Sequence, residues 1–412
     1  MNEKLDLSDK SLMTGNTLHI AVEAVAAHDG RGNLSFLSVH DQEHWNRYLG
    51  EFDRVYVVAR VREVPDELPT QMHLDDTRVH IIALPPYRGL GGTMMAVPKL
   101  TSILWRESKL ADHILLRLPG AISLLFGIIL VLRRRGFAVE MVGDIEQALR
   151  GLGRGLWILP FAKVMRWITR FITAHAYACT YVTRATLQGR YPPASGARSF
   201  AYSDVNISVH SLATEPARSG AGEPLTLCFC GSLANSYKGL DVLILAVGLL
   251  AKRGYNVRVR VMGDGTERPR LERQTRNVGV ADKFEFLGTV TSSQVMENFR
   301  RSDLFVMPSL TEGLPRAMVE AMSQGLAAVG SNVGGIPELL DKDALVTVGD
   351  AEALARRISV FLDDDQLRFA QARRNIEAAR AYDREVLAKE HLAFLQHVRA
   401  NRRTIVRQNR GS

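Results

Sequence analysis

Two glutamates and the helix between them carry the strongest chemical signal in this 412-residue sequence. Glu312 stands in a loop before a predicted helix over Arg316–Gln324, and Glu320 lies just over two helical turns further along the chain. Both carboxylates can therefore approach one ligand at the start of this helix. Free amides at a helix N-terminus suit a diphosphate, and carboxylates suit the hydroxyls of a sugar or ribose. Alone, such spacing is common by chance and favours a solvated helix residue at Glu320 and a helix cap at Glu312.

Two further loops follow predicted strands in the same half of the chain. Lys238 ends the loop after strand Leu225–Cys230, where it would be a mobile positive charge for a phosphate. This loop lacks the Gly-x4-Gly-Lys-Ser/Thr spacing of a Walker phosphate loop. Gly263 begins a Gly-Asp-Gly turn after strand Val257–Met262. A surface lysine and an ordinary turn are the alternatives when each loop is considered by itself.

In order and spacing, the loops between Leu225 and Leu340 resemble the donor-binding half of the family 4 retaining glycosyltransferases, which have the GT-B fold. The resemblance implies that Glu320 holds the ribose hydroxyls of a nucleotide. It implies that Glu312 contacts hydroxyls of the donor sugar, beside the amides of Gly313 and Leu314.

The same resemblance implies that Lys238 neutralises the diphosphate as it leaves. Many relatives carry an arginine where this chain has Ser232, so more of this task falls on Lys238 and the helix amides. The implied reaction moves a hexose-type sugar from a nucleotide-sugar donor to an acceptor with retention of configuration. It needs stabilisation of an oxocarbenium-like sugar and an anionic leaving group. The expected enzyme uses no metal and no cofactor besides the nucleotide-sugar co-substrate.

The first half of the chain resembles the family more loosely. Gly30 and Gly32 occupy the place of the family's glycine-rich loop, although they depart from its usual Gly-Gly pattern. Arg117 follows strand His113–Leu116, where many relatives present a histidine that this chain lacks. Asp144 follows the next strand. These four residues are the acceptor-side candidates, with a plain loop or a structural ion pair as the alternative.

Charge is unevenly distributed around the net value of +8. No acidic residue lies between Glu146 and Asp204, and that stretch contains eight basic residues. Such a surface favours an anionic partner: lipid headgroups, a phosphorylated acceptor or nucleic acid. No nucleic-acid recognition module is found, so nucleic acid is not expected as a partner.

Residues 157–173 combine apolar side chains at helical spacing with a basic face and the aromatic residues Trp157 and Trp167. This composition is typical of an interfacial amphipathic helix and predicts peripheral membrane contact. A crossover helix packed on its sheet, with a basic outer face, is the alternative.

Short β-rich runs alternate with helical patterns in both halves of the chain, which predicts the α/β class. The expected architecture is two Rossmann-like doubly wound domains facing a cleft. Residues 1–205 form the acceptor-side domain, 206–224 a linker, and 225–385 the nucleotide-sugar-binding domain. Residues 386–412 provide a helix that returns to the first domain and a polar tail.

Neither a secretory signal nor an apolar run of membrane-spanning length is found, so the expected location is cytoplasmic, at most peripheral at the inner face of the membrane. The preferred function is glycosyl transfer to a glycan, lipid-linked or other acceptor, in surface polysaccharide or glycolipid biosynthesis. A degenerate, non-catalytic nucleotide-sugar-binding protein and a sugar-nucleotide epimerase are the alternatives. An NAD oxidoreductase is disfavoured because neither half opens with Gly-x-Gly-x-x-Gly.

Overall fold

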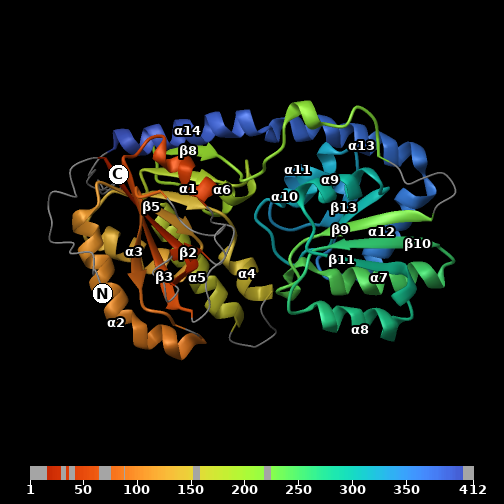
Figure 1. Cartoon of the computed structure of the whole chain (residues 1–412), viewed down its shortest axis with the longest axis horizontal. Helices are drawn as coiled ribbons and strands as arrows, with labels where there is room; N and C mark the ends of the chain where they lie inside the picture. Colours follow the sequence, from red (N-terminus) through yellow and green to blue (C-terminus); the bar gives the residue numbers. More distant parts are fainter. Residues whose placement is uncertain are drawn as a thin grey trace.

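The computed structural model describes residues 16–28, 34–36, 42–64, 76–87, 89–151, 158–217 and 224–401. In this part of the chain two sheets of mainly parallel strands lie side by side, each with its helices around it (Figure 1). The predicted α/β class and the two Rossmann-like units are confirmed.

The N-terminal sheet has the strand order β4-β3-β1-β5-β6-β7-β8, and short β2 pairs antiparallel with β1. Its strands are β1 (Thr17–His28), β2 (Leu34–Phe36), β3 (Arg54–Glu63), β4 (Val79–Leu84), β5 (His113–Leu118), β6 (Ala138–Met141), β7 (Ala178–Tyr181) and β8 (Arg198–Ala201). Strand order reverses between β1 and β5, and ligands of such sheets bind at the carboxyl ends of the strands at this point.

Helices cover both faces of this sheet. They are α1 (Gln42–Leu49), α2 (Gly89–Leu110), α3 (Ala121–Leu132), α4 (Ile145–Gly151), α5 (Ile158–Thr173) and α6 (Thr186–Arg190). In β5, Ile114 and Leu116 enter the core on one face, while Leu115 enters the core on the other. A strand buried on both faces reads as a continuous apolar run, which explains the sequence HILLRL.

The C-terminal sheet is parallel throughout, in the order β11-β10-β9-β12-β13-β14. Its strands are β9 (Leu225–Cys230), β10 (Val257–Met262), β11 (Phe284–Gly288), β12 (Leu304–Met307), β13 (Ala327–Ser331) and β14 (Leu345–Val346). Its helices are α7 (Leu240–Lys252), α8 (Arg268–Val278), α9 (Ser292–Arg300), α10 (Arg316–Ser323), α11 (Ile336–Leu339), α12 (Ala351–Asp363) and α13 (Asp365–Ala379). The order reverses between β9 and β12, so the loops after these two strands adjoin.

The last helix, α14 (Arg384–Ala400), lies along the N-terminal sheet (Figure 1). Its Phe394 is fully buried in the core on one face of that sheet and contacts Phe200 of β8, with 5.5 Å between ring centroids. The segment that enters α14 is tied to the predicted linker, because the Asp383 carboxylate accepts a hydrogen bond from the amide of Val209. Ile207, also in the predicted linker, is buried in the C-terminal core.

No helix among the described residues has the length and apolar character needed to cross a membrane.

Replacing Phe394 with alanine is expected to lower the free energy of unfolding by about 3–5 kcal/mol, because it empties a closed part of the core. Leu392→Ala, on the half-exposed side of the same helix, should cost less than about 1 kcal/mol. Urea unfolding followed by circular dichroism measures both. Equal losses in the two variants would contradict a contribution of α14 to the N-terminal core.

Candidate functional site

Lys238 and Glu312 form an ion pair where the loops after β9 and β12 meet. The ammonium Nζ of Lys238 lies 2.6 Å from Oε1 of Glu312, and the hydroxyl of Ser309 donates to the same oxygen at 2.8 Å. Glu312 is buried and Lys238 is mostly so. The two residues that the sequence predicts for the donor site are thus in direct contact.

Glycines let the lysine reach this position. The side chain of Lys238 passes Gly231, where a β-carbon would lie 3.3 Å from its Cγ. Gly239 adopts φ +72° and a β-carbon there would lie 2.0 Å from the carbonyl oxygen of Pro308. The loops after β9 and β12 therefore pack backbone to backbone at Gly239, where a larger residue would push them apart, whereas a larger residue at Gly231 would crowd the side chain of Lys238.

Glu320 lies on α10, the helix that follows the loop of Glu312. Its carboxyl is partly buried and burial raises its pKa, while the nearby guanidinium of Arg316 opposes this rise. Burial also raises the pKa of Cys230, at the end of β9, to about 12, with Glu320 raising it further and Lys238 lowering it. Glu320 and Lys238 thus both act on the end of β9 and face one region.

The first residues of α10 offer amides to a ligand. Pro315 occupies the N-cap position without a side-chain cap. Within the described part of the chain, no hydrogen-bond acceptor is found for the backbone amides of Gly313 and Leu314. Uncapped amides at a helix N-terminus favour a negatively charged ligand.

Ser232 and Gly263 shape the neighbouring loop. The hydroxyl of Ser232 accepts a hydrogen bond from the amide of Ala234 at 3.2 Å, so it holds its own turn. Gly263 has φ +132°, and a β-carbon there would lie 2.0 Å from the carbonyl oxygen of Gly231. In this structure Ser232 and Gly263 fix the positions of the loops after β9 and β10 relative to each other.

Two contacts join this site to the N-terminal half. Gly313 packs against the end of β6, where a β-carbon would lie 2.4 Å from the carbonyl oxygen of Val142. Glu338 of α11 accepts hydrogen bonds from the amides of Arg184, Ala185 and Thr186, at 2.6, 3.1 and 2.5 Å. The sequence analysis missed Glu338, although it follows the glycine pair after β13, because its partners lie more than 150 residues away.

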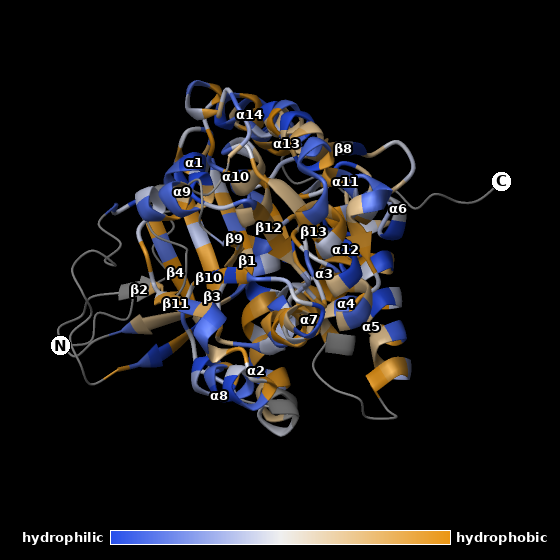
Figure 2. Cartoon of the chain, turned by 90° about the vertical axis from the view of Figure 1, so that its right-hand side faces the viewer, coloured by the Kyte–Doolittle hydropathy of each residue, from blue (hydrophilic) through white to orange (hydrophobic). Residues whose placement is uncertain are grey.

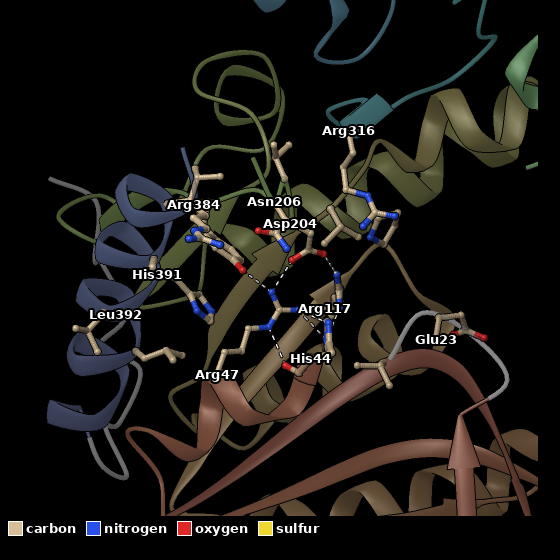
Figure 3. Close-up of a pocket in the computed structure, with 18 residues that line it drawn as sticks. Glu23, His44, Arg47, Arg117, Asp204, Asn206, Arg316, Arg384, His391 and Leu392 are labelled. Carbon is tan, nitrogen blue, oxygen red and sulfur yellow. Dashed lines mark hydrogen bonds and ion pairs between the residues drawn. The ribbon is translucent and has the colours of Figure 1, made fainter. Parts of the chain in front are cut away.

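A cavity of about 890 Å³ opens between the carboxyl ends of the N-terminal strands, α10 and α14 (Figure 3). Arg117 lines it, as the sequence predicts for a cleft residue. Asp204 is the centre of its polar floor: one carboxylate oxygen lies 2.6 Å from Nη1 of Arg47, and the other lies 3.1 Å from Nη2 of Arg117. These two guanidinium groups hold the pKa of Asp204 well below its usual range, against the effect of its burial.

His44 and His391 complete this floor. The ring of His44 contacts both Arg47 and Arg117, and the ring of His391 stacks on Tyr202 with 4.1 Å between centroids. The sequence analysis missed both histidines together with Arg47 and Asp204. They come from distant segments, and only the position of Asp204 at the end of the acid-free stretch could have drawn attention to it.

Asp144 does not face the cavity, contrary to the sequence-based expectation. It is buried, its carboxylate lies 2.5 Å from Nε of Arg190, and it accepts a hydrogen bond from the hydroxyl of Tyr191 at 2.7 Å. It also caps α4 by accepting from the amide of Glu146 at 2.9 Å. Asp144 therefore forms a structural ion pair, which was the alternative to a role in the cavity. Gly30 and Gly32 lie outside the described residues.

Part of the positive charge in the basic stretch between Glu146 and Asp204 is paired within the protein. Glu146 forms ion pairs with Arg166 and Arg190, at 3.1 and 2.9 Å. Arg184 donates to the carbonyl oxygen of Ala381. Glu146 thus lies at one end of this stretch in the sequence but beside its arginines in the structure. Among the residues that the structure describes, no group of three or more His, Cys, Asp or Glu side chains is arranged to hold a metal ion.

Comparison with known proteins matches residues 214–381 to the family described as glycosyl transferases group 1. CapJ of Staphylococcus aureus is 26% identical over 346 residues, covering 83% of this chain and 85% of CapJ. WcaL of Escherichia coli is 31% identical over 207 residues, which cover 48% of this chain and 50% of WcaL. Its full name is putative colanic acid biosynthesis glycosyltransferase WcaL.

Solved structures share the overall fold. Sucrose-phosphate synthase of Thermosynechococcus elongatus superposes with a TM-score of 0.65 at 15% identity, covering 93% of this chain and 99% of that one. HepE of Anabaena, solved with UDP-glucose, gives a TM-score of 0.61 at 16% identity, with 92% and 99% covered. The fold is that of the GT-B glycosyltransferases. The match of residues 214–381 to the glycosyl transferases group 1 family confirms the resemblance seen in the sequence.

The stability of the fold should depend on pH through His391. Burial and the guanidinium groups of Arg47 and Arg117 lower its pKa to about 3, although Asp204 opposes them. An unfolded histidine titrates near pH 6.5, so the unfolded chain binds more protons between about pH 3 and 6.5 and stability falls as the pH drops. From pH 7 to pH 5 this amounts to about 2 kcal/mol.

Urea unfolding of the wild type and of His391→Phe at both pH values checks this expectation. Phenylalanine can keep the stacking on Tyr202 but has no titratable group. The variant should lose about 2 kcal/mol less than the wild type between pH 7 and pH 5. The same loss in both proteins would assign the pH dependence to other groups.

Proposed function

We propose that this protein transfers a sugar from a nucleotide-sugar donor to a glycan, lipid-linked or other acceptor, with retention of configuration. The observation that carries the proposal is the contact of Lys238 with Glu312 beside the uncapped start of α10, inside the glycosyl transferases group 1 domain. A cation and free amides at one point suit a diphosphate leaving group, and the adjacent carboxylates suit sugar hydroxyls.

In this proposal the donor lies across the loops after β9 and β12. Glu320 binds the ribose hydroxyls, and Glu312 binds hydroxyls of the transferred sugar. The ammonium of Lys238 is already oriented by Glu312, so it can interact with the diphosphate without a large rearrangement. Preorganised charge of this kind stabilises a transition state because little reorganisation remains to be made.

We propose that the positive charge on the diphosphate comes from Lys238 and the amides of α10 rather than from a metal ion, and that the nucleotide-sugar is the only co-substrate. Support for the donor class comes from HepE, whose structure holds UDP-glucose. Support for a role in surface polysaccharide synthesis comes from the name of WcaL, and support for glycolipid synthesis comes from the phosphatidyl-myo-inositol mannosyltransferase of Mycolicibacterium smegmatis, 32% identical over 197 residues.

Variants of the donor site test this proposal. Lys238→Ala should lower turnover about 100-fold or more, because a charge-stabilising group is lost. Glu320→Gln should raise the donor KM about 10-fold, because hydrogen bonds from the ribose hydroxyls to a carboxylate are weakened. The assay is release of nucleoside diphosphate from UDP-, GDP-, ADP- and dTDP-sugars, with thermal shift as the binding readout.

Lys252→Ala, at the exposed end of α7, is the matched control and should behave as the wild type. If no nucleotide-sugar stabilises the folded wild type, the donor proposal is wrong. If a nucleotide-sugar binds but Lys238→Ala and Glu320→Gln leave turnover and KM unchanged, the site residues are wrongly assigned. Binding without any turnover would favour the non-catalytic alternative.

We also propose that α5 contacts a membrane surface. The helix buries Ala162 and Ile172, yet its outer face exposes apolar side chains: Phe161 is 45% exposed, Val164 54% and Trp167 65%. Lys163 and Arg170 are exposed beside this apolar strip. The helix lies at the edge of the molecule (Figure 2). An apolar strip with a basic flank suits an anionic lipid surface, whereas a simple crossover helix would turn only polar residues outward.

Binding to lipid vesicles tests the role of α5. The wild type should co-sediment with vesicles that contain phosphatidylglycerol. Val164→Ser combined with Trp167→Ser should reduce the bound fraction about 10-fold or more, because two apolar side chains no longer leave water. Leu245→Ser, which changes a similarly exposed side chain on α7 of the other half, should have no effect. Equal binding by both variants would contradict the proposed contact.

A further inference from the structure

The cavity beside the donor site gathers four arginines from four different elements. Arg47 comes from α1, Arg117 from β5, Arg316 from α10 and Arg384 from α14 (Figure 3). Segments this far apart in sequence have no local reason to place like charges around one space. The question is whether carboxylates of the protein already balance these charges.

The carboxylates balance only part of them. Asp204 is shared between Arg47 and Arg117, and buried Glu140 lies 3.8 Å from Nε of Arg117. Glu23 also lines the cavity, but its carboxylate forms an ion pair with Arg60 at 3.0 Å. Asp204 and Glu140 therefore offset Arg47 and Arg117. Glu320 interacts electrostatically with Arg316, and Asp383 with Arg384, but within the described residues neither carboxylate forms an ion pair with its arginine.

Arg316 and Arg384 carry the remaining charge. Both guanidinium groups are exposed, and within the described residues neither forms an ion pair. They lie on opposite sides of Asp204 in the view of Figure 3. Each is the first residue of its helix, where the helix dipole adds positive potential to the same wall of the cavity.

His391 lies in the wall of this cavity. Its ring is buried at the cavity wall, and within the described residues its Nε2 has no hydrogen-bond partner. Burial together with Arg47 and Arg117 disfavours the protonated ring, so the histidine adds no charge but reports a positive surrounding.

The remaining wall is apolar. It includes Leu387, Leu392 and Leu395 of α14, with Val22 and Val142 from the N-terminal sheet. A ligand that fits this cavity therefore needs an anionic part for the arginines and a part with C–H surface for the leucines. A neutral sugar would satisfy the apolar wall but would leave the arginines without a partner.

We propose that this cavity binds the acceptor and that the acceptor carries an anionic group, a phosphate or a carboxylate, held by Arg384. This inference rests on the proposed transferase function and specifies its acceptor. The diphosphate of the donor is assigned to Lys238 and the start of α10. The acceptor anion lies at Arg384, on the other side of Asp204 from Arg316 in the view of Figure 3.

Binding measured while a saturating nucleoside diphosphate occupies the donor site tests this. The probes are glucose 6-phosphate, glucuronate and a short-chain phosphatidic acid, with glucose as the neutral comparison. In isothermal titration the wild type should bind at least one anionic probe about 10-fold more tightly than glucose, and the preferred probe tells whether the anion is a sugar phosphate, a carboxylate or a lipid phosphate.

Arg384→Gln should lower the affinity for that probe about 10-fold, because charge-assisted hydrogen bonds are lost. Arg380→Gln, just before α14 and paired with Glu377, should leave it unchanged. Equal binding of glucose and of all anionic probes, or unchanged affinity in Arg384→Gln, would overturn the inference. So would anion binding that disappears once the nucleoside diphosphate is present.

The outcome for the donor is read separately. If the nucleoside diphosphate binds and the nucleotide-sugar turns over while no anionic probe binds, the transferase proposal stands and the anionic acceptor is wrong. If no nucleotide binds, the proposed function itself fails.

Discussion

Contact of backbone with backbone at the ends of β9, β12 and β13 determines where the charged groups of the proposed donor site lie. Gly239 and Gly334 have left-handed backbone conformations, and β-carbons there would lie 2.0 and 2.2 Å from carbonyl oxygens of the neighbouring loops. Only glycine fits such contacts. Because these loops cannot separate without losing their packing, Lys238 and Glu312 are held together before any ligand arrives.

Different interactions shape the contact between the two halves of the molecule and the neighbouring cavity. Gly313 lets the donor loop touch the end of β6, and Glu338 receives three backbone amides from the N-terminal half. The floor of the cavity depends instead on charge, since Asp204 fixes two guanidinium groups. Removing one partner from so buried a set would leave the others uncompensated. The donor side is thus shaped by close packing, and the neighbouring cavity is shaped by electrostatics.

Local patterns predicted much of this molecule. Strands such as Leu225–Cys230 and Val257–Met262 have the bounds expected from their apolar runs. Lys238 and Glu312 lie on the loops after β9 and β12, which are neighbours in the sheet, and Glu320 lies on the helix that follows the second loop. The cavity was beyond such reasoning, because its arginines and Asp204 come from segments that share no period or motif. Asp144 shows the reverse error: a carboxylate at a strand end was expected to face the ligand, but it is neutralised by Arg190, which the linear sequence does not place beside it.

The position of α14 has a consequence for how the chain is made. Phe394, Leu395 and Val398 complete the core on one face of the N-terminal sheet, yet they follow the whole C-terminal sheet in the sequence. On the ribosome, the first half emerges with that apolar face open while the second half, whose core is built from later segments, is still being made. The N-terminal domain can therefore be completed only after the C-terminal sheet has been translated, and the nascent chain must keep an unfinished sheet from aggregating until α14 has emerged.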